Sequence, residues 1–304
     1  MSSSEPNLRI LSLGAGVQST TLLLMAVEGA LPKLDYAIFA DTGWEPRAVY
    51  DHLDKVTVVA EQAELPILRV SKGNLRADML ASGKKFASIP YFIRSSDNTK
   101  GIGRRQCTSE YKLVPIQRKV RELLGATPPD FRRVPRGRFA EQWIGFSVDE
   151  IERVSDHRPV SYIVKRYPLI ELGMNRQDCM RWLKSRGWTS VEKSACIGCP
   201  YHGNRMWRNL RDNQPEEWRD AIEFDAALRR PGAQNGQLRG EAFLHRSLLP
   251  LSVAPIDRVT SAEWKTRQGN ILDAIADAEL EERLKEEGDP DGCSPYGCRS
   301  GMPV

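Results

Sequence analysis

The sequence of 304 residues has no apolar run that approaches the roughly 20 residues needed to span a membrane. It also lacks a secretory signal, because its first residues are polar and show no basic stretch followed by an apolar core. The net charge is only +4, which suits an anionic ligand but does not by itself indicate nucleic acid. We therefore expect a cytoplasmic protein with no membrane partner, built as one large domain or two modest ones.

Cysteine is scarce as well. The chain has six cysteines, and without an export signal they are expected to be metal ligands or redox thiols rather than disulfides. They are Cys107, Cys179, Cys196, Cys199, Cys293 and Cys298. Cys179 lies in an apolar helical pattern, which predicts a position in the core.

The most informative stretch is Leu8–Met25. Ile10–Leu13 form an apolar run of strand length, Gly14 and Gly16 permit a tight turn, and a helix is expected to begin near Ser19. Such a turn directs backbone N–H groups and the positive end of a helix dipole at one point, which favours an anion. Two alternatives remain open. One is an ordinary tight turn, and the other is a dinucleotide-binding fold, whose third glycine is replaced here by Ser19.

Strands and helices alternate through the first half of the chain. Strands are expected at Ile10–Leu13, Leu34–Ala40, Leu65–Val70 and Gln142–Phe146. Helices are expected from Ser19, with Leu22–Val27 as the apolar face, and at Ala48–Ala63 and Leu75–Ser82. This alternation predicts an α/β fold with a right-handed, doubly wound parallel sheet. Ligands gather at the carboxyl ends of such strands, so Asp41, Thr42 and Gly43 are site candidates. Alternatively, Asp41 caps a helix that begins near Pro46.

Local signals give the remaining elements. Asn175 is expected to cap a helix of residues 177–186, which Gly187 ends. A lid-like loop is expected at 83–103, followed by a segment at 104–121 that is polar first and helical later. A solvated arginine-rich loop is expected at 126–139 and an extended stretch at 167–170. Further helical residues are expected up to about 230, and an amphipathic helix or pair of helices at 261–287.

Cys196-Ile-Gly-Cys199 is the sharpest local signal for chemistry. Two thiolates at this spacing can hold one metal centre, and the glycine lets the backbone turn around it. Cys107 is the best third ligand, because it also lies in a candidate site segment. An iron–sulfur cluster, a zinc site that adds Cys107 and His202, and a dithiol redox pair all fit this pattern.

Basic residues surround Cys107 in the sequence. Arg104, Arg105 and Lys112 lie within a few positions of it. Arginine matches the oxygens of phosphate and sulfate, and a cationic neighbourhood favours a thiolate. For each of these basic residues considered alone, exposure to solvent at the end of a helix is as good an interpretation as binding an anion.

Together these segments resemble the phosphoadenylyl-sulfate (PAPS) reductase family, within the adenine-nucleotide α-hydrolase-like superfamily that includes the ATP pyrophosphatases. The likeness covers roughly residues 8–225 and joins five segments in the family's order. They are Ser12–Ser19 as a modified PP-loop, Phe39–Glu45 with Asp-Thr-Gly, Arg105–Pro115 with its cysteine, lysine and proline, Trp143–Arg153, and Tyr167–Asp178. The expected parts of the chain are a disordered leader at 1–7, a nucleotide-binding domain with a cysteine cluster at 8–230, a helical extension at 231–288 and a mobile tail at 289–304.

The resemblance implies roles for individual residues. The phosphate or sulfate group would lie against Ser12, Gly14, Gly16, Gln18 and Ser19, and the adenosine against Asp41, Thr42 and Gly43. Lys112 and Arg153 would be further anion contacts. Cysteine ligands of a [4Fe–4S] cluster would be Cys107, Cys196 and Cys199, with zinc as the alternative metal. The family's cluster-bearing members have an adjacent cysteine pair, and Thr108 at its second position leaves a fourth iron site open.

The implied activity is thiol-dependent reduction of adenylyl sulfate or phosphoadenylyl sulfate to sulfite, with a thioredoxin-like reductant. Gln18 replaces the aspartate of ATP-cleaving members, which favours the reductase form. The chain lacks the Glu-Cys-Gly-Leu-His tail of the reductases. Cys298 and Cys293 match that tail in position only, so they would either supply the attacking thiol or be incidental thiols of an unstructured tail. One alternative is an ATP-dependent sulfurtransferase that thiolates a nucleic acid from a three-cysteine cluster. Another is a non-catalytic nucleotide-binding or zinc-stabilised interaction protein.

Overall fold

A computed structural model describes most of the chain. The described residues are 5–81, 89–95, 99–154, 160–191, 194–230, 240–261, 263–264, 268, 293–294 and 297–298. The chain divides into two compact units, one made of residues 1–201 and 214–254, the other of 202–213 and 255–304. Most of the predicted helical extension, including its amphipathic stretch at 261–287, and most of the tail lie outside the described residues.

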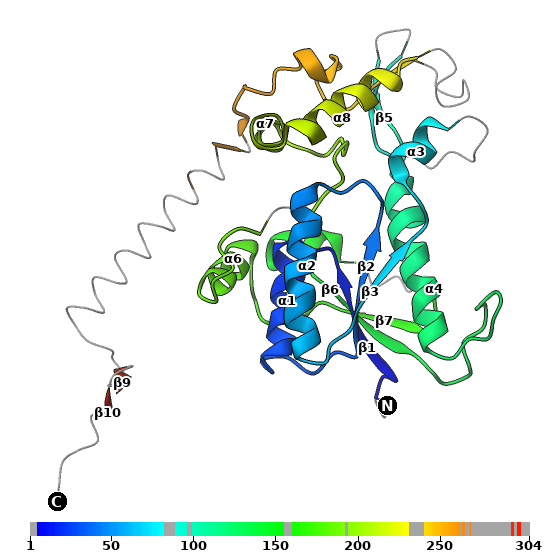
Figure 1. Cartoon of the computed structure of the whole chain (residues 1–304), viewed down its shortest axis with the longest axis vertical. Helices are drawn as coiled ribbons and strands as arrows, with labels where there is room; N and C mark the ends of the chain where they lie inside the picture. The colour runs from blue at the N-terminus through cyan, green and yellow to red at the C-terminus, as the bar shows by residue number, and fades with distance from the viewer. Residues whose placement is uncertain are drawn as a thin grey trace, which may run out of the picture. The chain divides into compact units, whose positions relative to one another are not determined.

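A five-stranded parallel sheet forms the centre of the first unit (Figure 1). Its strand order is β3-β2-β1-β6-β7. The strands are β1 (Leu8–Leu13), β2 (Tyr36–Asp41), β3 (Ile67–Ser71), β6 (Ala140–Ile144) and β7 (Ile163–Arg166). All four neighbouring pairs are parallel. The order reverses at β1, as in doubly wound sheets, so the predicted α/β fold class is confirmed.

Helices cover both faces of this sheet, because successive side chains of a strand point to opposite sides. Leu11 belongs to a core formed with α1 (Val17–Val27) and α2 (Arg47–Gln62). Ile10 belongs to a second core, formed with α4 (Val114–Leu123). Figure 1 shows α1 and α2 on one side of the strands and α4 on the other.

The predicted lid segment contains part of a second sheet. Three short strands pair antiparallel in the order β5-β4-β8. They are β4 (Phe92–Arg94), β5 (Lys100–Ile102) and β8 (Glu241–Phe243). The partner strand β8 lies about 150 residues away in sequence, and pairing over such a separation leaves no local signal. The sequence therefore predicted this segment as a loop.

The extended stretch predicted at residues 167–170 is wrong. The strand β7 ends at Arg166, and α5 (Pro168–Glu171) follows it immediately. Proline suits the first turn of a helix, because its ring fixes a helical φ angle and its missing N–H has no helical partner there. The Pro-Leu-Ile run is thus a short helix start, which apolar character alone did not distinguish from a strand.

The remaining helices follow the predicted pattern. Asn175 caps α6 (Arg176–Lys184) by accepting from the Asp178 N–H at 3.0 Å, and Gly187, with φ of +83°, follows the helix end. The other elements are α3 (Leu75–Leu80), a π-helical segment (Thr108–Leu113), two 3₁₀ segments (Val148–Arg153 and Leu251–Val253), α7 (Asn204–Asn213), α8 (Pro215–Ala227), and the paired β9 (Cys293–Ser294) and β10 (Gly297–Cys298). Among the described residues, no helix is both long and apolar enough to cross a bilayer.

Candidate functional site

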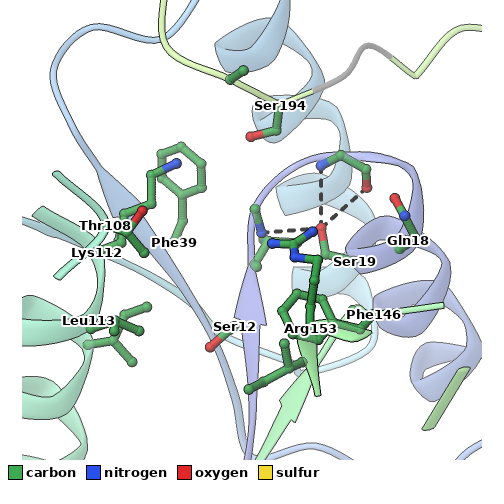
Figure 2. Close-up of a pocket in the computed structure, with 18 of the residues that line it drawn as sticks. Ser12, Gln18, Ser19, Phe39, Thr108, Lys112, Leu113, Phe146, Arg153 and Ser194 are labelled. Carbon is green, nitrogen blue, oxygen red and sulfur yellow. Dashed lines mark hydrogen bonds between the residues drawn. The ribbon is translucent and has the colours of Figure 1, made fainter. Parts of the chain in front are cut away.

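The glycine turn after β1 is closed by a serine side chain. The Ser19 hydroxyl oxygen accepts from the N–H groups of Gly14 at 3.2 Å and Gly16 at 3.3 Å. These bonds appear as dashed lines around Ser19 in Figure 2. The residue with a positive φ is Ala15, at +53°, rather than either glycine. The turn thus holds a strained alanine conformation and two N–H groups that are shared with Ser19.

A cavity of about 590 Å³ lies at the carboxyl edge of the parallel sheet, against this turn. Figure 2 shows Lys112 on one side of it and Ser19 and Arg153 on the other, with Ser12 between them. The sequence-predicted residues that line it are Ser12, Gly14, Gly16, Gln18, Ser19, Thr42, Lys112, Arg153, Cys107, Cys196 and Cys199. The fold therefore gathers most of the candidate residues in one place.

Asp41 and Gly43 are not among the residues that line the cavity. Asp41 instead stabilises the turn after β2, where one carboxylate oxygen accepts from the Gly43 N–H at 2.7 Å and from the Tyr50 hydroxyl at 2.8 Å. The helix α2 begins after Pro46 with no side-chain cap, so Asp41 does not cap it. Their predicted contact with adenosine stays a prediction, and Thr42 is the member of this motif that reaches the cavity.

Behind the cavity wall, four polar side chains from three distant segments meet. The Glu45 carboxylate oxygen Oε1 lies 3.3 Å from the Lys112 ammonium, 3.4 Å from the Cys196 sulfur and 3.1 Å from the Thr42 hydroxyl. The Glu45 side chain is only 1% exposed, and its other oxygen, Oε2, is buried with no hydrogen-bond partner among the described residues. Burial is the largest single influence on the pKa of Lys112 and lowers it, but the charge and hydrogen bond of Glu45, together with the nearby cysteines, leave that pKa raised.

Three thiols reach the cavity from two segments. Cys107 stands at the start of the π-helical segment, and Cys196 and Cys199 lie in one turn, where the Cys199 N–H donates to the Cys196 carbonyl at 3.1 Å. Burial raises the pKa of Cys196 and of Cys199, so both are protonated thiols at neutral pH in the absence of a metal. Cys179, by contrast, is fully buried in the core as predicted, and burial raises its pKa to about 11.

The three cysteines can be compared with the ligand set that a metal ion requires. In the described part of the chain, no three histidine, cysteine or acidic side chains form a group that could hold a metal ion. The sulfur of Cys196 is engaged by Thr42, at 3.3 Å, and by Glu45. The three thiols share a cavity, but in this arrangement they do not form such a group. A metal at Cys107, Cys196 and Cys199 stays a prediction.

An aromatic residue fixes the turn that carries the cysteine pair. The carbonyl of Trp44 accepts from the Ile197 N–H at 2.9 Å, and Gly198 packs directly against the Trp44 ring. The ring is held in turn by its own N–H, which donates to Asp220 at 2.5 Å, and by a tilted contact with Phe224. The motif after β2 therefore positions the Cys-x-x-Cys turn.

The side of the cavity near α6 is rich in arginine. Arg153 stacks over the Phe146 ring at 4.3 Å and pairs with Glu150. Arg176 donates to the side-chain carbonyl of Gln18 at 2.7 Å, while the amide of Gln18 donates to Glu150 at 3.0 Å. Arg176 also lines the cavity, although it was not among the predicted site residues. The sequence held one indication of this role, because Arg176 lies within the Tyr167–Asp178 segment that resembles the PAPS reductase family.

Comparisons with known proteins give limited information. No protein-family model matches the chain, and no curated protein matches it. Among solved structures, the chain is similar to a phosphoadenylyl-sulfate (PAPS) reductase from Candida auris in its phosphate complex. The two are 20% identical, the match covers 63% of this chain and 76% of the other, and the TM-score is 0.40. The α/β assignment rests on the strand order observed in this chain.

Proposed function

We propose that the cavity binds an adenine nucleotide that carries sulfate or phosphate, and that the chain performs thiol-dependent sulfur chemistry on it. The form of this chemistry that we favour is reduction of adenylyl sulfate or phosphoadenylyl sulfate to sulfite. The observation that carries the proposal is the meeting of an anion-binding turn, Lys112 and three cysteines around one cavity. Only the fold brings these segments together, since Gly14, Lys112 and Cys196 are far apart in sequence.

The size and charge of the cavity suit such a ligand. Its volume of about 590 Å³ falls within the roughly 300–1,000 Å³ of small-molecule sites. Lys112, Arg153 and Arg176 contribute positive charge to its walls. A sulfate or phosphate oxygen is a hydrogen-bond acceptor like the Ser19 hydroxyl, so it can replace that hydroxyl at the N–H groups of the turn.

The reduction proceeds in two steps that balance. A cysteine thiolate attacks the sulfonate sulfur, an S–S bond forms, and the S–O bond to the nucleotide phosphate breaks. A thiolate of a thioredoxin-like dithiol then attacks the cysteine sulfur, which releases sulfite; its second thiol closes a disulfide and frees the cysteine. The dithiol supplies both electrons. The resemblance implies a thiol from the tail, and we therefore assign the attack to Cys298, whose side chain lies outside the described residues.

A nucleotide-binding and turnover series tests the proposal. Calorimetry with adenylyl sulfate, phosphoadenylyl sulfate, ATP and AMP measures binding, and sulfite release in the presence of thioredoxin measures turnover. Lys112→Met should weaken binding of the sulfated nucleotides at least about tenfold, because it removes a charge-assisted contact. Lys119→Met is the matched control, since Lys119 lies on α4, which directly follows the segment of Lys112, but it pairs with Glu122 outside the cavity. No binding by the unchanged chain, or equal loss in both variants, would contradict the proposal.

A second function is ATP-dependent sulfur transfer to a nucleic acid. It is favoured by one observation, the three cysteines on one cavity, whereas Gln18 in place of an acidic residue disfavours it. Pyrophosphate release from ATP without sulfite release would identify this activity. Nucleotide binding with neither product would instead indicate a non-catalytic nucleotide-binding protein.

Metal content is tested separately. The chain and its Cys107→Ser variant are purified without oxygen, and iron, zinc and sulfide are counted. Broad absorbance near roughly 400 nm that disappears in the variant would establish an iron–sulfur cluster with Cys107 as a ligand. Zinc without sulfide would refute the cluster and leave the nucleotide turn and tail thiols as the reactive parts.

A further inference from the structure

The positive charge of the chain is concentrated in one segment. Residues 114–140, which comprise α4 and the loop leading into β6, contain seven arginine or lysine residues and two acidic residues, a net charge of +5. The whole chain has a net charge of +4, so everything outside this segment sums to −1. We call residues 114–140 the basic segment. Its exposed arginines are Arg118, Arg132, Arg133, Arg136 and Arg138.

Most arginines of the basic segment lack a carboxylate partner among the described residues. Its ion pairs there are Lys119–Glu122 and Arg132–Asp130. Elsewhere arginines are commonly neutralised by acids, and examples are Arg69–Asp54, Arg166–Glu171, Arg186–Glu28, Arg211–Asp257 and Arg229–Asp225. The positive field of the basic segment is thus not cancelled locally.

The donors of this segment differ in their availability. Arg121 donates to the Tyr162 hydroxyl at 3.3 Å, Arg138 donates to the Leu124 carbonyl at 3.2 Å, and Arg118 lies over the Phe131 ring. Arg133 and Arg136 make neither a hydrogen bond nor an ion pair with the described residues, and both are exposed. Their guanidinium groups therefore offer a full set of donors to an external anion.

The surface here is also concave. A hollow of about 480 Å³ lies between the loop and the beginning of β7. Its lining comprises residues 134–139 together with Ser161, Tyr162 and Val164. The hollow lies at the amino edge of the sheet, because Ala140 pairs with Leu8 where β6 and β1 begin. Figure 1 shows the loop after α4 at this edge, whereas the glycine turn follows the other end of β1. The nucleotide cavity extends to the same strand as the hollow, because Val160, Ile163 and Lys165 line it.

We propose that the basic segment binds the phosphate backbone of single-stranded nucleic acid. Several exposed arginines spread over one segment need a ligand with several anions, which a free phosphate or a single nucleotide does not provide. Tyr162 also lines the hollow, but it packs partly against the core beneath α4 and accepts from Arg121, so the arginines carry the proposed contact with the strand. None of the exposed arginines of the basic segment lines the nucleotide cavity, so the segment can anchor the chain on nucleic acid without occupying that cavity.

Salt-dependent binding of a labelled strand tests this assignment. The fluorescence anisotropy of a 20-nucleotide single-stranded RNA is measured with the full chain at several salt concentrations. Arg133→Gln combined with Arg136→Gln removes two contacts, so the slope of log affinity against log salt should become shallower by about 1.4. At 0.1 M salt this corresponds to an affinity about 25-fold weaker. Both residues are exposed and make no described bond, so the variant is expected to fold, and its urea midpoint checks this.

A charge-matched control separates this surface from net charge. Lys55→Gln combined with Arg219→Gln removes the same charge from exposed positions on α2 and α8. This control should keep both the slope and the affinity of the unchanged chain. Equal losses in the two double variants, or an affinity that does not vary with salt, would overturn the proposal. So would a polyglutamate peptide that competes as well as unlabelled RNA, because it would assign the surface to an acidic protein.

Discussion

Gly198 is the position at which adding a single methyl group should distort the candidate site most. A side-chain carbon added there would lie 2.8 Å from two ring carbons of Trp44 and closer still to a third. Ordinary carbon–carbon contacts are about 3.5–4.0 Å. Gly198→Ala therefore requires either the Trp44 ring or the Cys-x-x-Cys turn to move by roughly 1 Å or more.

The ring has little freedom to move. Trp44 is 4% exposed, its N–H donates to Asp220, and its ring lies 4.4 Å from that of Phe224. Asp220 is itself held by Arg76 at 2.6 Å. Overpacking a close-packed site costs about 1–3 kcal/mol, and we expect Gly198→Ala to fall in that range. The turn should also shift, which would weaken any ligand or metal that depends on Cys196 and Cys199.

Urea unfolding with a double-mutant cycle measures this effect. Trp44→Leu alone is destabilising because it leaves a cavity, but Gly198→Ala in that background should cost less than about 0.5 kcal/mol. The coupling between the two positions should then be about 1–3 kcal/mol. Gly203→Ala is the matched control, since nothing lies within 4 Å of a side-chain carbon there. Additive changes at Trp44 and Gly198, or equal stability of Gly198→Ala and Gly203→Ala, would refute the reasoning.

Three further perturbations address the surroundings of the cavity. Glu45→Gln removes the charge that raises the pKa of Lys112, so burial then lowers that pKa and calorimetric nucleotide binding should be lost at a lower alkaline pH. Burial lowers the pKa of His52 from 6.5 in the folded chain. Below about pH 6.5 the unfolded chain therefore binds more protons than the folded one, and stability decreases as the pH decreases. Between pH 7 and pH 5, the urea midpoint of His52→Gln should decrease less than that of the unchanged chain. Ser19→Ala removes the acceptor of two turn N–H groups, which should cost about 1 kcal/mol in urea unfolding and change nucleotide affinity; an unaltered affinity would show that the turn does not meet the ligand.

The parallel sheet could be predicted from sequence because its signals are local. Apolar runs such as Ile10–Leu13 have the length of a strand, and glycines or polar residues mark where each run ends. Alternation with helices then fixes the handedness and the parallel arrangement. Since ligands meet such sheets at the carboxyl ends of strands, most candidate residues could also be placed on one edge before their geometry was known.

Other features depend on contacts that leave no mark in nearby residues. The antiparallel sheet needs β8, which is remote from β4 in sequence. Glu45 is the last residue of the Phe39–Glu45 motif, but nothing near it in sequence indicates a contact with Lys112 and Cys196. The strain at Ala15 was missed for a different reason, because the flanking glycines are the residues expected to adopt a positive φ.

Glu45 also decides how much positive charge the cavity offers to a ligand. A buried carboxylate without compensation is strongly unfavourable, and Lys112 is the cation that compensates it. The lysine side chain is 35% exposed, so it can contact a ligand oxygen while it remains beside Glu45. The net charge of this pair is close to zero, however, and Arg153 is likewise paired with Glu150. Under the proposed function, attraction of a sulfated nucleotide would therefore come from the turn N–H groups and from other cations of the lining, such as Arg105 and Arg176. The proposal thus divides the anion site between two walls and gives Lys112 the role of orienting the ligand beside the cysteines.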